Sequence, residues 1–216
     1  MLVTDRDLLI LEPRVFNDLG WIGQRLHRAT NATMLAGGVG VTDASGPFAG
    51  LGIGAGRVLV INGTPVEIAS IDSPTQATIS LVRASAADAP IPARALSGTV
   101  TIECFTFAPQ IAQAHDRIIR ALGLALGPTV EGGGPGEDRI VNAGDVARVI
   151  ALGALHLILA AATPLVADPS GVRAKAEAYR ERFAAARRGL VAEIDLDGDG
   201  IADAARRVSL VHMVRG

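Results

Sequence analysis

The chain has 216 residues, of which 49% are apolar but only 3% are aromatic, and its formal net charge is −2. This length suits one large domain, or a helical body with an inserted module, and the near balance of charge argues against nucleic-acid binding driven by net charge. A single cysteine, Cys104, cannot form an internal disulfide. We expect no secretion signal, because Asp5, Arg6 and Asp7 stand where such a signal needs apolar residues.

Helical structure is predicted at the N-terminus. Thr4 and Asp7 have the spacing of a capping box, and Pro13 suits the first position of a helix. Apolar residues then recur at steps of four, three and four, at Val15, Leu19, Ile22 and Leu26. This stripe predicts an amphipathic helix that ends at about residues 30–33.

Residues 34–107 read as a β module. The clearest signal is a pair of strand-like runs, 57–61 and 64–68, on either side of Asn62-Gly63. Asn-Gly favours a tight hairpin turn, because both turn residues need positive φ. Further strands are expected at 76–83 and 97–107. Four or more short strands favour a small antiparallel β-barrel or sandwich, inserted between helices.

Helical periodicity returns beyond the β module. One helix is predicted from Pro109 to about Leu122, and an Ala-rich helix from about Asn142 to Ala162, after an irregular loop rich in Gly and Pro. The stretch 149–167 approaches the length of a membrane span. Its Ala and Gly content favours a buried helix instead, so we expect no membrane partner.

The most amphipathic helix is predicted at 172–190. Its apolar residues alternate steps of four and three along one stripe, at Val172, Ala176, Tyr179, Phe183, Ala186 and Leu190. Charged residues, mostly Arg, occupy the remaining faces. Such a helix packs one stripe and leaves the rest exposed.

The C-terminal segment combines an acidic turn, 195–203, with an apolar run of strand character, 208–214. The predicted fold is therefore α+β. It consists of a helical bundle body (residues 1–33 and 108–216), an inserted small antiparallel β-barrel or sandwich (34–107), and a C-terminal strand or arm.

The acidic turn has the oxygen spacing of a calcium-binding loop. Positions one, three, five and nine of such a loop are matched by Asp195, Asp197, Asp199 and Asp203. Gly200 stands at position six, but position twelve, where an EF-hand has a bidentate Glu, is Arg206. This difference argues against an EF-hand and leaves two interpretations: a weak Ca²⁺ site, and the favoured one, an Asp/Gly turn that caps the helix 172–190 and reverses the chain. No other cofactor is expected.

No coherent set of catalytic residues is present in the sequence, and we expect no enzymatic activity. The segment 50–55 formally matches a dinucleotide-binding pattern, but a strand follows it where that motif needs a helix, so a glycine turn is favoured. The histidines, at positions 27, 115, 156 and 212, lack the spacing of a helical metal site. Cys104 alternates with apolar residues along a strand, which indicates a buried thiol.

Four strings then suggest a family: Thr4–Leu9 with Glu12-Pro13, and residues 105–117, 151–156 and 191–200. In this order they resemble the head-to-tail adaptor (connector or neck) proteins of tailed bacteriophages. The resemblance implies a virion protein of the neck region that assembles in the host cytoplasm. It implies a ring, typically of twelve subunits, that joins the portal protein to a stopper or tail terminator protein. DNA would pass through its channel without sequence recognition.

A ring of identical subunits needs a heterologous interface, and two segments are our candidates for it. The first is the helix 172–190, and the second is the run 208–214, which can add a strand to a partner sheet. The predicted interface residues are Val172, Tyr179, Arg180, Phe183, Arg187, Val208, Leu210 and Val214. The alternative function is a Ca²⁺-dependent binding or adhesion module that uses the acidic turn.

Overall fold

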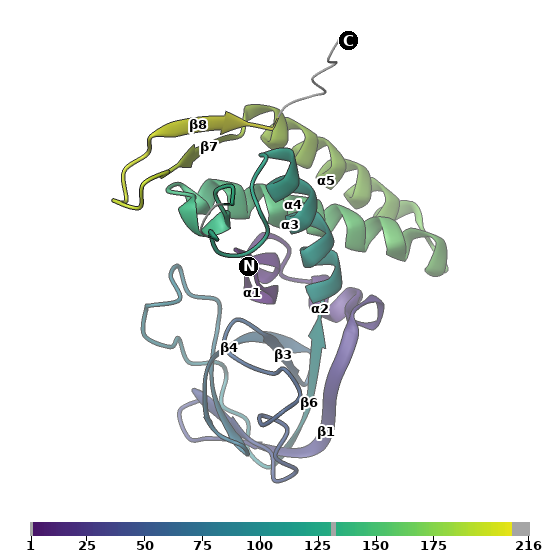
Figure 1. Ribbon diagram of the computed structural model, residues 1–216. Helices are drawn as coiled ribbons and strands as arrows, with labels where there is room; N and C mark the ends of the chain where they lie inside the picture. The colour runs from purple at the N-terminus through teal and green to yellow at the C-terminus, as the bar shows by residue number, and fades with distance from the viewer. Residues whose placement is uncertain (1, 131–132, 209–216) are drawn as a thin grey trace. The chain divides into compact units, whose positions relative to one another are not determined.

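A computed structural model of the chain describes residues 2–130 and 133–208 (Figure 1). The chain divides into two compact units: Thr4–Ala108 forms one, and Met1–Val3 with Pro109–Gly216 forms the other. We refer to them as the barrel unit and the helical unit.

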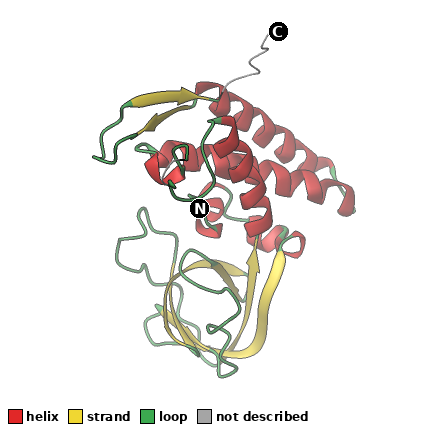
Figure 2. Cartoon of the chain, viewed as in Figure 1, coloured by secondary structure: helices red, strands yellow, loops and turns green. Residues whose placement is uncertain are grey.

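The barrel unit begins with two short helices, α1 (Asp5–Leu11) and α2 (Val15–Asp18), and a 3₁₀ turn, η1 (Gly20–Ile22). Six strands follow: β1 (Gln24–Met34), β2 (Gly40–Thr42), β3 (Val58–Ile61), β4 (Thr64–Ser73), β5 (Gln76–Ser80) and β6 (Thr99–Thr106). All pair antiparallel, in the closed order β1-β2-β5-β4-β3-β6 (Figure 2). Because β6 also pairs with β1, the sheet has no open edge.

Apolar side chains fill the inside of the barrel. Burial alternates strictly along β6, so that Val100, Ile102 and Cys104 point inward. Ile68 of β4 and Ile79 of β5 belong to the same core, and each is at most 1% exposed. The barrel interior is therefore a packed core.

The predicted hairpin is confirmed. Ile61 pairs with Thr64, and Asn62 and Gly63 between them have φ values of 45° and 82°. Positive φ at both positions is what the Asn-Gly pair predicted. The strands expected on either side of the turn, and those expected near 76–83 and 97–107, are β3, β4, β5 and β6.

The predicted helix through Leu26 is wrong. Helix α2 ends at Asp18, and the long strand β1 occupies Gln24–Met34. Two glycines explain the change: a Cβ at Gly20 would lie 2.9 Å from the ring of Phe105, and one at Gly23 would lie 2.9 Å from a backbone oxygen of β6. The chain approaches β6 too closely there for a helix with side chains, and it continues as a strand paired with β6.

The helical unit contains α3 (Ala108–Ala121), α4 (Ala143–Ala162) and α5 (Ser170–Gly189), with 3₁₀ turns η2 (Glu137–Arg139) and η3 (Thr163–Leu165). These helices confirm the three predicted segments. A hairpin of β7 (Val191–Ile194) and β8 (Ala204–Arg207) follows, with Ile194 paired to Ala204. The acidic residues therefore lie in a turn that reverses the chain, as predicted, but β7 separates this turn from α5, so the predicted capping of that helix is wrong.

Helix α4 is the apolar centre of the helical unit. In the described part of the chain, Ala143–Leu165 is the one helical segment long and apolar enough to cross a membrane by length and composition. However, 61% of its most apolar 18-residue window is buried in the protein. A buried core helix passes the same test of composition, and burial is what the sequence predicted for this segment.

The predicted overall architecture, a helical bundle body with an insertion, is wrong. The N-terminal helices α1 and α2 belong to the barrel unit, whose strands form a closed six-stranded barrel. They are only seven and four residues long. The physical reason is that Gln24–Met34 pairs with β2 and β6 as a strand of the barrel, so no long N-terminal helix remains to join a bundle. An α+β class describes the chain only in part. The expected strand at 208–214 lies outside the described residues except for Val208.

Candidate functional site

The turn between β7 and β8 brings together three of the four predicted metal ligands. Carboxylate oxygens of Asp195, Asp197 and Asp203 lie within 4.8 Å of one another. Asp199 is not part of this group; its carboxylate accepts a hydrogen bond from the backbone N–H of Ile201 at 2.7 Å. Hard cations such as Ca²⁺ bind oxygen ligands of this kind. These three residues are the ones that could hold such an ion.

The same carboxylates also stabilise the turn. Asp195 accepts hydrogen bonds from the backbone N–H groups of Gly198 and Gly200, at 2.5 and 2.9 Å, and Asp203 accepts one from Leu196 at 2.8 Å. The hydrogen bond from Gly198 is the main reason that the pKa of Asp195 is lowered, and it outweighs the opposing effect of burial. An ionised Asp195 therefore closes the turn by accepting hydrogen bonds from two backbone N–H groups.

A positive side chain already lies beside this turn. Arg139 Nη1 is 3.9 Å from Asp195 Oδ2, and a Cβ at Gly198 would lie 2.3 Å from the same nitrogen. Arg206, at position twelve of the calcium-loop pattern, is directed elsewhere and donates to the backbone oxygen of Gly123 at 2.6 Å, just beyond α3. Arg139 thus supplies part of the charge that a cation would supply to Asp195.

The apolar interface residues predicted on α5 pack within the helical unit. Tyr179 is only 4% exposed. Phe183 is half-buried against α4, where a Cβ at Gly153 would lie 3.0 Å from its ring, and Val172 is also half-buried. The contact of Phe183 stabilises the α4–α5 pair, and the role of all three residues toward another subunit stays a prediction.

The charged interface residues of α5 are more accessible. The side chain of Arg180 is 61% exposed, and its Nη2 lies 2.6 Å from a carboxylate oxygen of Glu177. Arg187 is half-buried in the last turn of the helix. Arg182 lies over the ring of Tyr179, 5.3 Å from its centroid, in a cation–π arrangement. The face of α5 that solvent reaches is therefore basic.

The C-terminal interface residues can be placed only in part. Val208 directly follows β8 and is half-buried, whereas Leu210 and Val214 lie outside the described residues. Strand β8 pairs with β7 on one side. In the described ranges no strand pairs with its other side, so this edge is open.

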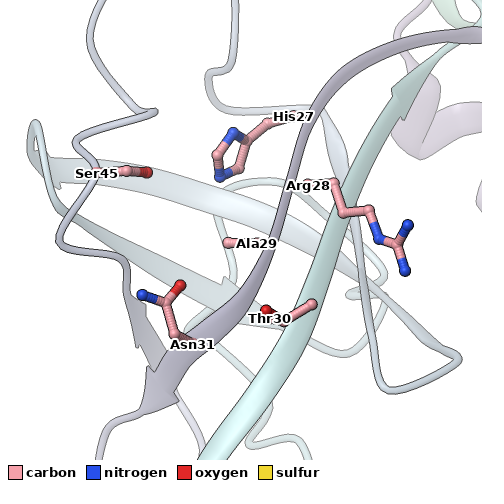
Figure 3. A pocket seen from close by; sticks show the side chains of 6 residues that line it. All are labelled: His27, Arg28, Ala29, Thr30, Asn31 and Ser45. Carbon is pink, nitrogen blue, oxygen red and sulfur yellow. The ribbon is translucent and has the colours of Figure 1, made fainter.

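An open pocket of about 540 Å³ lies on the barrel, at a histidine to which the sequence gave no role (Figure 3). Figure 3 shows the His27 ring on the same side of β1 as Ser45, while Arg28 points the other way. The pocket is lined by His27, Arg28, Ala29, Thr30, Asn31 and Ser45. No motif had marked these positions.

Asp43, which follows β2, fixes this histidine. Its Oδ2 lies 2.7 Å from His27 Nε2, and its Oδ1 accepts hydrogen bonds from the backbone N–H and the hydroxyl of Ser45 at 2.9 and 2.8 Å. Burial opposes ionisation of Asp43, but these hydrogen bonds outweigh it and lower its pKa. Because the Ser45 hydroxyl donates to Asp43 and not to His27, the three side chains do not form a nucleophile–base relay. They fasten β1 to the segment after β2.

Two further buried groups, His115 and Cys104, lie outside these sites. A carboxylate oxygen of Glu137 in η2 lies against Nε2 of His115 in α3, and neighbouring helical positions gave no hint of this contact, because the two residues are distant in sequence. The predicted burial of Cys104 is confirmed, and burial is the main cause that raises the pKa of its thiol to about 12. A thiol with so high a pKa is a poor nucleophile at neutral pH.

Comparison with protein-family models, with curated proteins and with solved structures finds no match to this chain. The function is therefore inferred from the residues and surfaces described above.

Proposed function

We propose that this chain is a structural virion protein, the head-to-tail adaptor of a tailed bacteriophage. It forms a ring of about twelve subunits in the neck. This ring joins the portal protein to a stopper or tail terminator protein, around a channel through which DNA passes. The four strings that resemble adaptor proteins lie in α1 and the segment that follows it, at the β6–α3 junction, in α4, and in β7 with its acidic turn.

The observation that carries this proposal is the open edge of β8. A closed ring requires that one surface of each copy be covered by a different surface of its neighbour or partner. An unpaired strand edge has free backbone donors and acceptors, which a strand from another chain can satisfy. Strand β8 lies near the end of the chain, and an apolar sequence, residues 208–214, continues from it. The edge and this sequence together suit a protein that is completed by assembly.

The test compares two truncated chains in their assembly with portal rings of the genome that encodes the protein. A chain that ends at Asp203 lacks β8 and everything after it, whereas a chain that ends at Val208 keeps β8. We expect the first to lose assembly, measured by co-sedimentation, with circular dichroism confirming that its helices remain. Assembly equal to that of the intact chain would contradict the role of β8. The second chain separates the contribution of β8 from that of residues 209–216.

A second candidate is a Ca²⁺-dependent binding module. The observation that favours it is the set of three carboxylates within 4.8 Å of one another. Arg139 and the backbone N–H groups already satisfy Asp195, the most buried of the three. We therefore rank this function below the adaptor.

A further inference from the structure

Helix α5 carries three arginines at seven-residue spacing, Arg173, Arg180 and Arg187. Seven residues make nearly two full turns of an α-helix, so these side chains leave the same side of α5 at intervals of about 10.5 Å. Arg173 and Arg180 are exposed, and Arg187 is half-buried. We call these three residues the arginine row.

The row belongs to a helix whose charge differs in sign from that of the chain. Ser170–Gly189 contains six basic and two acidic residues, a net charge of +4, whereas the whole chain has −2. All other residues together therefore carry −6. A second copy of this chain thus offers acidic surface that is complementary to α5.

The acidic turn between β7 and β8 is the best match for the row. Residues 195–203 include four Asp and no basic residue, a charge of −4. Asp197, Asp199 and Asp203 are exposed. Two large apolar side chains of the same turn, Leu196 and Ile201, are 53% and 67% exposed. These two side chains give the turn apolar surface that a second copy can bury.

Within one chain the acidic turn and the end of the row that carries Arg173 are apart. Figure 1 shows the tip of the β7–β8 hairpin at one end of the helical unit and the first turns of α5 at the other. In the turn, Asp195 is close to Arg139, and in the row, Arg180 pairs with Glu177 of the same helix. A contact of the turn with the Arg173 end of the row therefore needs two copies.

We infer that the acidic turn of one copy docks on the arginine row of the next copy. The two surfaces are different, so the contact is heterologous and repeats head to tail, which is the type of contact that closes a ring. This inference rests on the proposed adaptor function, for which it names the subunit interface. Duplex DNA would also be attracted to the row, but the exposed Leu196 and Ile201 and the opposite charges of α5 (+4) and the turn (−4) favour a second copy.

Charge reversal tests the inference on the full chain. The row variant carries Arg173→Glu and Arg180→Glu, and the turn variant carries Asp197→Lys and Asp199→Lys. We expect each to raise the dissociation constant of self-association by roughly 100-fold, because like charges then face each other. An equimolar mixture should regain association, since the reversed row of one variant meets the reversed turn of the other. Analytical ultracentrifugation measures the self-association of the row variant, of the turn variant and of their mixture.

A matched control places the same charge change on the barrel, with Arg25→Glu and Arg94→Glu, two exposed residues outside α5. It should associate like the unmodified chain. The inference is overturned if the row variant also does so, if the mixture of folded variants does not regain association, or if the unmodified chain stays monomeric at every concentration. It is likewise overturned if the row variant loses only binding of a fluorescent DNA duplex.

The outcomes separate this inference from the adaptor proposal. If the row variant still forms complete rings on portal rings, the proposed subunit contact is ruled out. The adaptor function is not affected by that result. If the unmodified chain never binds portal rings, the adaptor function is ruled out. Self-association that changes with the charge reversals as expected would still support the contact between turn and row.

Discussion

The ring of Phe183 on α5 lies against Gly153 of α4, where an added Cβ would be 3.0 Å from Phe183 Cε2 and 3.4 Å from the Cβ of Ala114 on α3. All three helices of the helical unit thus meet at one glycine. The absence of a side chain at position 153 allows α5 to pack closely on α4.

Gly153→Val should therefore destabilise the helical unit by about 1–3 kcal/mol, the usual cost of overpacking a core. Urea unfolding followed by circular dichroism measures the change. Gly144→Ala is the control, because no atom lies within 4 Å of a Cβ added there. It should be neutral or stabilise the helix by up to about 1 kcal/mol. Equal stability of the valine variant and the unmodified chain would show that the contact is loose.

The buried carboxylate of Glu67 in the barrel unit should contribute strongly to stability. It is 0% exposed and accepts hydrogen bonds from the guanidinium groups of Arg6 and Arg83. Glu67→Ala leaves both cations buried without this partner, so we expect a loss of about 3–5 kcal/mol in unfolding free energy. Glu103→Ala removes a more exposed ion pair with Arg28 and should cost no more than about 1 kcal/mol. Similar losses in the two variants would refute the role of Glu67.

Asp43 should make the barrel sensitive to acid. Its pKa in the folded chain is below the ordinary value of 3.8, so its ionised form stabilises the fold above that value. This contribution is lost as the pH falls from 3.8 through the lowered pKa. The stability difference between the unmodified chain and Asp43→Asn should therefore shrink between about pH 7 and pH 2. Denaturant titrations at several pH values measure it, and a constant difference would contradict the assignment.

The acidic turn should not require calcium. Because Asp195 is satisfied by backbone donors and lies near Arg139, we expect isothermal titration of the intact chain with Ca²⁺ to give no saturable heat. Saturable heat that Asp197→Ala abolishes would favour the Ca²⁺-dependent module instead. An Arg139→Gln variant adds a stricter test, since removal of the neighbouring cation is the change that would most favour an ion.

Local sequence signals predicted the elements that local interactions stabilise. Asn62-Gly63 indicated its hairpin because positive φ is a property of those two residues, and α5 followed from its apolar stripe. The apolar stripe that ends at Leu26 predicted a helix that does not form. The close approach of β6 to Gly20 and Gly23 is a tertiary contact, which the local sequence does not indicate. Such contacts override helical periodicity.

The candidate sites also divide into those that local sequence indicates and those that depend on tertiary contacts. The acidic turn was found because its residues are adjacent in sequence, and the Asp/Gly pattern carried the signal. The pairing of His27 with Asp43 joins β1 to the segment that follows the neighbouring strand β2, and the contact of His115 with Glu137 joins a helix to a later turn. No spacing in the sequence could indicate either pair. The Asp43-Ala-Ser45 string alone could have suggested a side-chain-capped turn.

The most direct measurement is native mass spectrometry of portal rings mixed with the purified chain, using portal protein from the same genome. The adaptor account predicts that each portal ring gains a fixed number of 22.2-kDa chains, about twelve, in one cooperative step. Portal rings of unchanged mass beside free 22.2-kDa chains, at every mixing ratio, would contradict it.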